Sequence, residues 1–94
     1  MYNSILYTIV GHGGVMRVEI LLPKWGMTMQ EGTISSWTVS LGSIVAEGDP
    51  VAIIETEKVE TDLPSPASGT IIEILVPEGD TVLVGTIIAW LETE

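Results

Sequence analysis

The chain has 94 residues, of which 46% are hydrophobic, and three basic residues against thirteen acidic ones give a net charge of −10. This length fits one small domain with a modest core, and the absence of cysteine excludes disulfides, thiolate metal sites and cysteine nucleophiles. The excess of acid argues against nucleic acid and against anionic membranes, whose phosphates require Lys and Arg. The acidity either keeps the domain soluble or steers it towards basic partner surfaces.

The first fifteen residues differ from the rest because they contain no charged residue apart from one histidine. The apolar run Ile5–Val10 is too short to span a bilayer. The segment also lacks the positive start and the small-residue cleavage site of a signal peptide. Since Met16-Arg17-Val18 resembles a true protein start, we expect residues 1–15 to be a flexible extension and residues 16–94 to form the domain.

From Met16 onward, Gly and Pro separate short runs rich in Val, Ile and Thr, which is the pattern of strands and turns. No window carries a helical stripe. The expected strands are Val18–Leu22, Gly32–Val39, Ser43–Ala46, Val51–Glu57, Val59–Leu63, Gly69–Val76, Thr81–Val84 and Thr86–Leu91. The sequence therefore predicts an all-β fold, either a sandwich or a flattened barrel.

An internal repeat relates the two halves of the domain. A shift of 37 positions places Gly32-Thr33-Ile34 on Gly69-Thr70-Ile71 and Glu55-Thr56-Glu57 on Glu92-Thr93-Glu94. Two equivalent units related by a pseudo-twofold axis can each give strands to both sheets, which predicts a core containing Ile34, Val45, Ile53, Ile71, Val82 and Ile88. The repeated glycines are expected to be structural turn residues, namely Gly32, Gly48, Gly69, Gly79 and Gly85.

Lys58 is one of only two lysines, and it stands alone in the acidic run Glu55–Asp62 between two predicted strands. Neither Gly, Asn nor Pro occurs between Glu57 and Val59, yet strand-like sequence lies on both sides. A tight hairpin there must place Lys58 at its tip with the side chain outward, because the apolar alternation on each flank fixes which residues face the core. One interpretation is a solvated turn residue that keeps a sheet edge soluble. The other is a single amine that a modifying enzyme can select.

Three segments resemble one known family. They are Leu22–Gly32, with its Met-Thr-Met-Gln-Glu-Gly run, Glu55–Val59 around the lysine, and Pro64–Gly69 after it. In this order they resemble the lipoyl domain of the dihydrolipoamide acyltransferase component of 2-oxo acid dehydrogenase complexes, within the biotinyl/lipoyl-attachment family. The resemblance implies a flattened barrel-sandwich hybrid of two four-stranded antiparallel sheets. It also implies covalent attachment of lipoic acid to Lys58, at the pole opposite the chain ends.

The implied function is that of a carrier and not of an enzyme, with neither catalytic residues nor a metal site of its own. In the family, a lipoate ligase or lipoyltransferase loads the lysine. A thiamine diphosphate-dependent 2-oxo acid decarboxylase then acylates this swinging arm, an acyltransferase passes the acyl group to coenzyme A, and dihydrolipoamide dehydrogenase reoxidises the arm. The family resemblance also leads us to expect a cytoplasmic protein, or a mitochondrial matrix protein if the source is eukaryotic. We expect the isolated module to be monomeric, because its acidic surface offers no obvious apolar patch.

Recognition by these partners is expected at two places. The first surrounds the arm and comprises Glu55, Glu57, Val59, Glu60 and Asp62. The second is the loop with Trp25, Gly26 and Met27, which in the family lies beside the attachment hairpin. The alternative is that Trp25 and Met27 pack into the end of the barrel, and we favour this alternative for Met27.

Other carriers remain as alternatives. A biotinyl carrier domain of a carboxylase has the same fold, but its signature has Met on both sides of the lysine, where this chain has Glu57 and Val59. The glycine-cleavage carrier is longer and has additional helices. An unmodified barrel-sandwich adaptor module would not need the Glu-Lys-Val tip. The sequence does not identify the 2-oxo acid, nor whether the chain is part of a longer acyltransferase.

Overall fold

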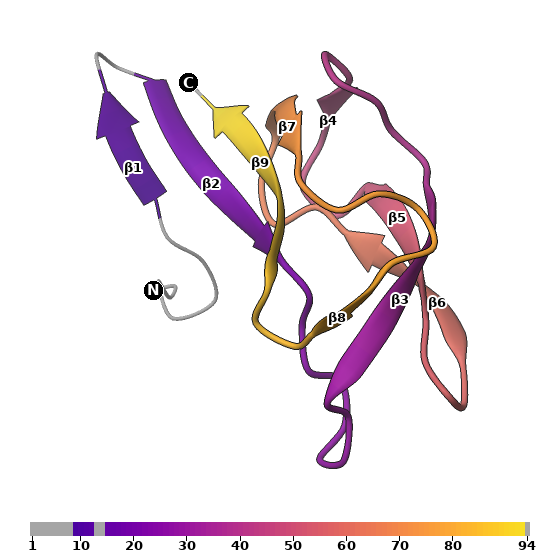
Figure 1. Ribbon diagram of the computed structural model, residues 1–94. Coiled ribbons are helices and arrows are strands. Elements are labelled where there is room, and N and C mark those ends of the chain that lie inside the picture. The colour runs from indigo at the N-terminus through magenta and orange to yellow at the C-terminus, as the bar shows by residue number, and fades with distance from the viewer. Residues whose placement is uncertain (1–8, 13–14, 94) are drawn as a thin grey trace.

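A computed structural model describes the backbone of residues 9–12 and 15–93 and the side chains of residues 16–93. Every regular element in this part of the chain is a strand (Figure 1). The strands are β1 (Ile9–His12), β2 (Val15–Leu21), β3 (Glu31–Trp37), β4 (Ile44–Val45), β5 (Pro50–Glu55), β6 (Glu60–Pro64), β7 (Gly69–Ile74), β8 (Thr81–Leu83) and β9 (Ile87–Thr93).

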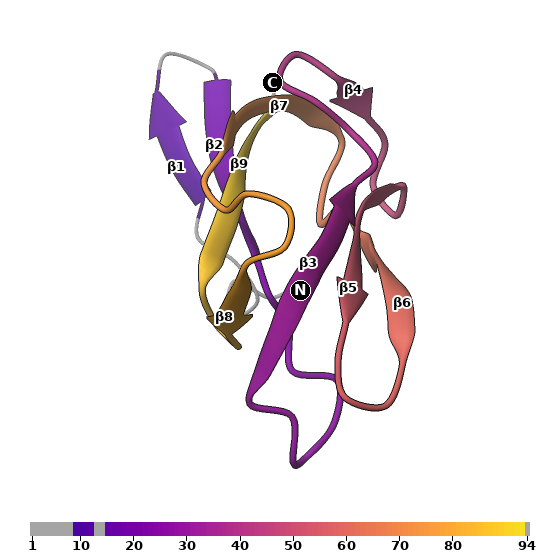
Figure 2. The ribbon, with the colours of Figure 1, turned by 45° about the vertical axis from the view of Figure 1, so that its right-hand side comes forward.

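The strands form two antiparallel sheets that enclose the core (Figures 1 and 2). One sheet has the order β1-β2-β9-β7-β4 and the other has the order β6-β5-β3-β8. Without β1, each sheet has four strands, so the predicted architecture of two four-stranded sheets is confirmed. Each of the eight predicted strands has a counterpart in the structure, with ends that differ by up to three residues.

The pseudo-twofold symmetry is visible in the strand order. If β2, β3, β4 and β5 are exchanged for β6, β7, β8 and β9, the order β2-β9-β7-β4 becomes β6-β5-β3-β8, which is the order of the other sheet. Hydrogen bonds follow the same exchange, since Gly42 N donates to Ile71 O at 2.8 Å and Gly79 N donates to Ile34 O at 2.7 Å. The repeat in the sequence is therefore a repeat of backbone structure.

Buried side chains from both halves form one core, which includes Ile20, Leu22, Ile34, Ile54, Ile71, Ile88 and Leu91. Of the predicted core residues, Ile34, Val45, Ile71 and Ile88 are buried, and Val82 packs partly buried against them.

The prediction for Ile53 is wrong, because Val51, Ala52 and Ile54 are the buried residues of β5. Register shifts in the pairing of β5 with both β3 and β6 break the simple alternation of faces.

The repeated glycines serve two purposes. Gly48, Gly79 and Gly85 lie outside the strands with φ of 92°, 92° and 88°, a backbone conformation that glycine adopts without steric cost. The expectation of a turn is wrong for Gly32 and Gly69, which lie within β3 and at the start of β7. At these two positions a Cβ would come within 3.0 Å of the neighbouring strand, so close packing, and not a turn, requires glycine.

The N-terminal extension contains an element that the sequence did not predict. Ile9–His12 pair with β2 as an antiparallel edge strand, with Ile9 opposite Val18 and His12 opposite Val15. Residues 1–8, 13 and 14 lie outside the described part of the chain. Among residues 16–93, whose side chains the structure describes, those of the hydrophobic core lie at or after Val18.

Candidate functional site

The hairpin between β5 and β6 places Lys58 at its tip, as the sequence predicts. The last ladder pair is Glu55 with Glu60, and Thr56 N then donates to Val59 O at 2.8 Å. Only Glu57 and Lys58 lie beyond this bond, and both are exposed. The tip therefore protrudes from the end of the sheet that contains β3, β5 and β6 (Figure 2).

The Thr56 side chain holds the turn from inside. Its Oγ1 accepts hydrogen bonds from Lys58 N at 3.3 Å and from Val59 N at 3.2 Å. The same hydroxyl lies 3.3 Å from Val59 O, to which it can donate. The sequence analysis did not predict this role, although threonine hydroxyls commonly bond the backbone of their own turn.

The Lys58 amine is available for chemistry. The one ion pair among residues 16–93 joins Arg17 Nε to Glu92 Oε2 at 4.0 Å, so no described carboxylate holds the Lys58 ammonium in a salt bridge. The neighbouring Val59 is 56% exposed, which leaves an open apolar surface beside the amine. An enzyme can therefore approach Lys58 without first opening the hairpin.

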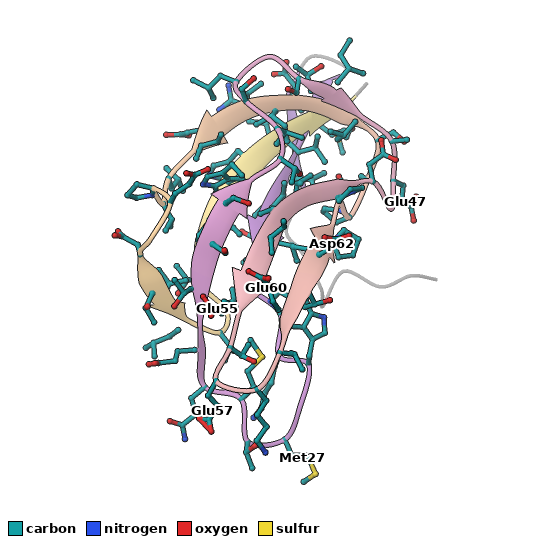
Figure 3. All side chains as sticks on the ribbon, turned by 90° about the vertical axis from the view of Figure 1, so that its right-hand side faces the viewer. Met27, Glu47, Glu55, Glu57, Glu60 and Asp62 are labelled. Atoms are coloured by element: carbon teal, nitrogen blue, oxygen red, sulfur yellow. The ribbon has the colours of Figure 1, made fainter. Side chains whose placement is uncertain are left out.

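Carboxylates surround the hairpin, as the sequence predicts. Glu55, Glu57, Glu60 and Asp62 are all exposed, and they follow β5 and β6 away from the tip (Figure 3). Glu60 is held in place, since its Oε2 accepts a hydrogen bond from Ser35 Oγ at 3.1 Å. The hairpin thus carries one cation among several anions, which favours approach by a basic partner surface.

The loop before β3 forms the other wall of the site. The loop residues Trp25, Gly26 and Thr28–Gln30, the start of β3 and the hairpin residues Glu55–Val59 line a groove of about 840 Å³. Within the loop, Met29 N donates to Gly26 O at 3.1 Å and Trp25 N approaches Met29 Sδ at 3.3 Å. The expectation that this loop lies beside the attachment hairpin is therefore met in the structure.

Two loop side chains behave differently from one another. Met27 is 93% exposed and points away from the domain (Figure 3), so our preference for a packed Met27 is wrong. Met29 instead packs partly buried against the core, two residues further along the loop. Trp25 is 44% exposed and lines the groove. Trp25 and Met27 are thus both accessible to a partner.

A second groove, of about 1,090 Å³, lies across the pseudo-twofold axis. Its walls include Leu22-Pro23 and Ser65-Pro66, which are equivalent in the two halves, and the equivalent turns at Gly48 and Gly85. The nucleophilic side chains that line it are those of Lys24 and Ser65. The Ser65 hydroxyl donates a hydrogen bond to Ala67 O at 2.6 Å. Among the described residues no group of His, Cys, Asp or Glu could hold a metal ion. Lys58 is therefore an exposed amine at the apex of a hairpin, outside this groove.

No helix in the described residues could cross a membrane.

The fold and the exposed hairpin lysine define a small all-β module built to present one amine. Comparison with known proteins gives the family, since residues 18–91 match the family described as "Biotin-requiring enzyme", the biotin/lipoyl domain. The chain belongs to this biotin/lipoyl attachment family.

Curated relatives are acyltransferase components. The chain is 44% identical over 71 residues to the dihydrolipoyllysine-residue acetyltransferase component of the pyruvate dehydrogenase complex of Corynebacterium glutamicum, a match of 76% of this chain and 10% of that protein. It is 40% identical over 76 residues to the corresponding component of the acetoin cleaving system of Bacillus subtilis, a match of 81% of this chain and 19% of that protein. The chain thus spans less than a fifth of the length of these relatives.

Solved structures with this fold come from both branches of the family. The lipoyl domain of the 2-oxoglutarate dehydrogenase complex of Azotobacter vinelandii superposes with a TM-score of 0.61 at 32% identity, covering 80% of this chain and 96% of that one. The urea carboxylase of Kluyveromyces lactis superposes with a TM-score of 0.65 at 30% identity, covering 78% of this chain and 6% of that one. The fold is therefore shared by a lipoyl domain and by part of a carboxylase.

Proposed function

We propose that this module is a lipoyl carrier and that Lys58 is its attachment site. The observation that carries the proposal is the position of Lys58, an unpaired and exposed amine at the apex of a hairpin in a fold of the attachment family. The acyltransferase components among its relatives support lipoyl over biotin. The residues present fit the group, because amide formation needs only an accessible amine and the tip supplies one.

The chain itself has no thiol or disulfide, since it contains no cysteine. Bound lipoate supplies a disulfide that accepts an acyl group and electrons together. The protein's contribution is to hold the attachment point clear of the sheets, so that Lys58 can enter the active sites of several enzymes in turn. Tethering the reactive group to one module also raises its effective concentration at each of these sites.

The partners that we propose follow from this role. Lys58 is presented first to a lipoate ligase or lipoyltransferase, and then to a thiamine diphosphate-dependent 2-oxo acid dehydrogenase, an acyltransferase domain and dihydrolipoamide dehydrogenase. The exposed carboxylates of the hairpin and the side chains of Trp25 and Met27 form the surface offered to them. We expect the module to be monomeric and to work in the cytoplasm, or in the mitochondrial matrix if the source is eukaryotic.

A biotinyl carrier is the second candidate, because the fold superposes equally well on a urea carboxylase. Against it stand the neighbours of the lysine, Glu57 and Val59, where the biotinyl signature has Met on both sides. Because both groups would be joined to the same amine, the mass of the adduct distinguishes the two candidates.

The test is the intact mass of the 94-residue chain after reaction with lipoate, ATP and a lipoate ligase, and separately with biotin and a biotin ligase. Peptide fragmentation then assigns any adduct, and Lys24 is an internal control because it is the only other lysine. A lipoyl increment on Lys58 alone is the expected result. A biotinyl increment would transfer the module to the carboxylases, and no increment with active ligases would support an unmodified adaptor.

A further inference from the structure

The turn that presents Lys58 has an unusual requirement. Two-residue hairpin tips normally use turns with positive φ, which suit the twist of the strands and favour Gly or Asn. No residue other than glycine has a positive φ in the described part of the chain, so Glu57 and Lys58 form the tip with negative φ. A tip of this kind matches the strand twist poorly and needs another restraint.

The Thr56 hydroxyl provides such a restraint. It receives both Lys58 N, at 3.3 Å, and Val59 N, at 3.2 Å, so that one oxygen fixes the two amide groups on either side of the Lys58 Cα. Thr56 N closes the hairpin through its bond of 2.8 Å to Val59 O. Among the hydrogen bonds of the described side chains, no other side chain reaches the backbone of residues 57–59.

Because these hydrogen bonds lie at an exposed tip, their loss should change the conformation of the turn more than the stability of the fold. Residues 57–59 are exposed, so their amides can bond water when the hydroxyl is removed, and the fold then loses little free energy. What changes is the distribution of backbone conformations at the tip. An enzyme that takes the amine from the apex in one geometry then meets a smaller fraction of competent molecules.

We propose that Thr56 is the positioning residue for modification of Lys58, acting through the two amides that its hydroxyl fixes. This inference rests on the proposed function, because it concerns the same lysine. It goes beyond the proposed function because an exposed lysine alone is then not sufficient. The modifying enzyme must also recognise the conformation of the turn.

The experiment compares three variants as substrates of a lipoate ligase. Thr56→Val keeps the size of the side chain and removes the hydroxyl, whereas Thr56→Ser keeps the hydroxyl. Thr61→Val is the matched control, because Thr61 is an exposed threonine on the same hairpin whose hydroxyl makes no hydrogen bond within residues 16–93. The measurements are kcat/KM for modification, Tm, and amide hydrogen exchange of Lys58 and Val59 in the unmodified protein.

We expect Thr56→Val to lower kcat/KM by about threefold to tenfold. Thr56→Ser should restore most of the rate, and Thr61→Val should leave it unchanged. Lys58 and Val59 amides should exchange faster in Thr56→Val alone, with a Tm close to wild type. Modification of Thr56→Val at the wild-type rate would overturn the inference, as would failure of Thr56→Ser to rescue it.

The two proposals fail in different ways. If the wild-type chain is modified and Thr56→Val is modified equally well, the carrier function stands and the positioning role falls. If wild-type Lys58 is not modified at all, the carrier function falls, and the positioning role falls with it. Amide hydrogen exchange in the unmodified protein measures the protection of the turn independently of any ligase. Unchanged exchange of the Lys58 and Val59 amides in Thr56→Val would show that the hydroxyl does not hold the tip.

Discussion

The same substitution at two equivalent positions, Gly32→Ala and Gly69→Ala, should have very different costs. A Cβ at Gly69 would lie 2.3 Å from Glu92 O and 2.9 Å from Glu92 C, both backbone atoms of β9. At Gly32 the closest atom would be Ile54 Cγ2 at 2.9 Å, a buried side-chain methyl group that must shift by about 0.5 Å while the backbone stays in place. The contrast is useful because the repeat makes each glycine a control for the other.

The magnitude follows from what must move. To bring the Gly69 contact to an ordinary separation of about 3.4 Å, β7 and β9 must separate by about 1 Å. That movement disrupts one or two ladder hydrogen bonds near the pair of Thr70 with Glu92, at about 1 kcal/mol each, and adds a packing strain of about 1–3 kcal/mol. The lower entropy of the unfolded alanine chain offsets about 0.5–1 kcal/mol in both variants. These terms give about 1–4 kcal/mol for Gly69→Ala, and we expect a loss of about 3 kcal/mol there against about 1 kcal/mol for Gly32→Ala, a difference of about 2 kcal/mol.

Urea unfolding followed by tryptophan fluorescence and by circular dichroism measures both free energies. For a domain of this size the difference corresponds to a separation in Tm of about 8–16 °C between the variants. An equal loss in the two variants would refute the reasoning, because it would mean that a clash with backbone and a clash with a side-chain methyl group cost the same. A stable Gly69→Ala would show that β7 and β9 separate freely.

Four further predictions concern the site and the extension. Lys58→Arg should abolish modification, measured by intact mass, while Tm stays within about 2 °C because an exposed tip contributes little packing. Moving the lysine to position 57 or 59, with Lys58 replaced by the displaced residue, should also abolish modification, and a modified variant would show that the ligase tolerates any lysine near the tip. Neutralising Glu57 and Glu60 as Glu→Gln should slow association with a basic partner and flatten its dependence on salt in stopped-flow measurements, and an unchanged salt dependence would exclude these carboxylates from steering. Deleting residues 1–15 should leave Tm nearly unchanged because the core residues of the described part of the chain all lie at or after Val18, and a large drop in Tm would contradict the domain boundary.

Most of the fold could be predicted because two independent patterns agree. Short apolar runs between Gly and Pro residues predict the strands, and the 37-residue repeat predicts that the strands come in two equivalent sets. The structure repeats even the details of strand pairing, since Ile34 opposite Ile54 in one sheet corresponds to Ile71 opposite Leu91 in the other. The repeat could predict such equivalences because a strand pairing depends on which residues face the core.

The sequence could not predict which strand residues are buried where the alternation of core-facing and solvent-facing positions is interrupted. The register of β3 with β5 shifts between Ile34 and Ser36, and that of β7 with β9 shifts between Ile71 and Glu73. After such a shift two successive residues can both face the core, as Val51 and Ala52 do, and the period of two no longer identifies buried positions. Ile53 is therefore only partly buried, and nothing in the apolar pattern distinguishes it from its buried neighbours.

The site was predictable to a similar degree. The isolated lysine and the lack of turn residues around it were enough to place Lys58 at a tip. The side chains that shape its surroundings were harder, because Met27 and Met29 are chemically alike and only the three-dimensional path of the loop exposes the first and packs the second. The role of Thr56 depends on a turn geometry with negative φ, which the residue types of the tip permit but do not specify.

The pseudo-twofold symmetry makes the end of β9 equivalent to the end of β5, which leads into the Lys58 hairpin. Glu55-Thr56 and Glu92-Thr93 occupy equivalent positions, each in register with the same residues of its partner strand, since Thr33 faces Glu55 as Thr70 faces Glu92. Both halves thus supply the same strand geometry and the same threonine. Only the first copy continues into a described hairpin, and there the hydroxyl of Thr56 binds the amides of Lys58 and Val59. The two halves share the sheet geometry, so we expect recognition of Lys58 to depend on the turn and not on the sheets.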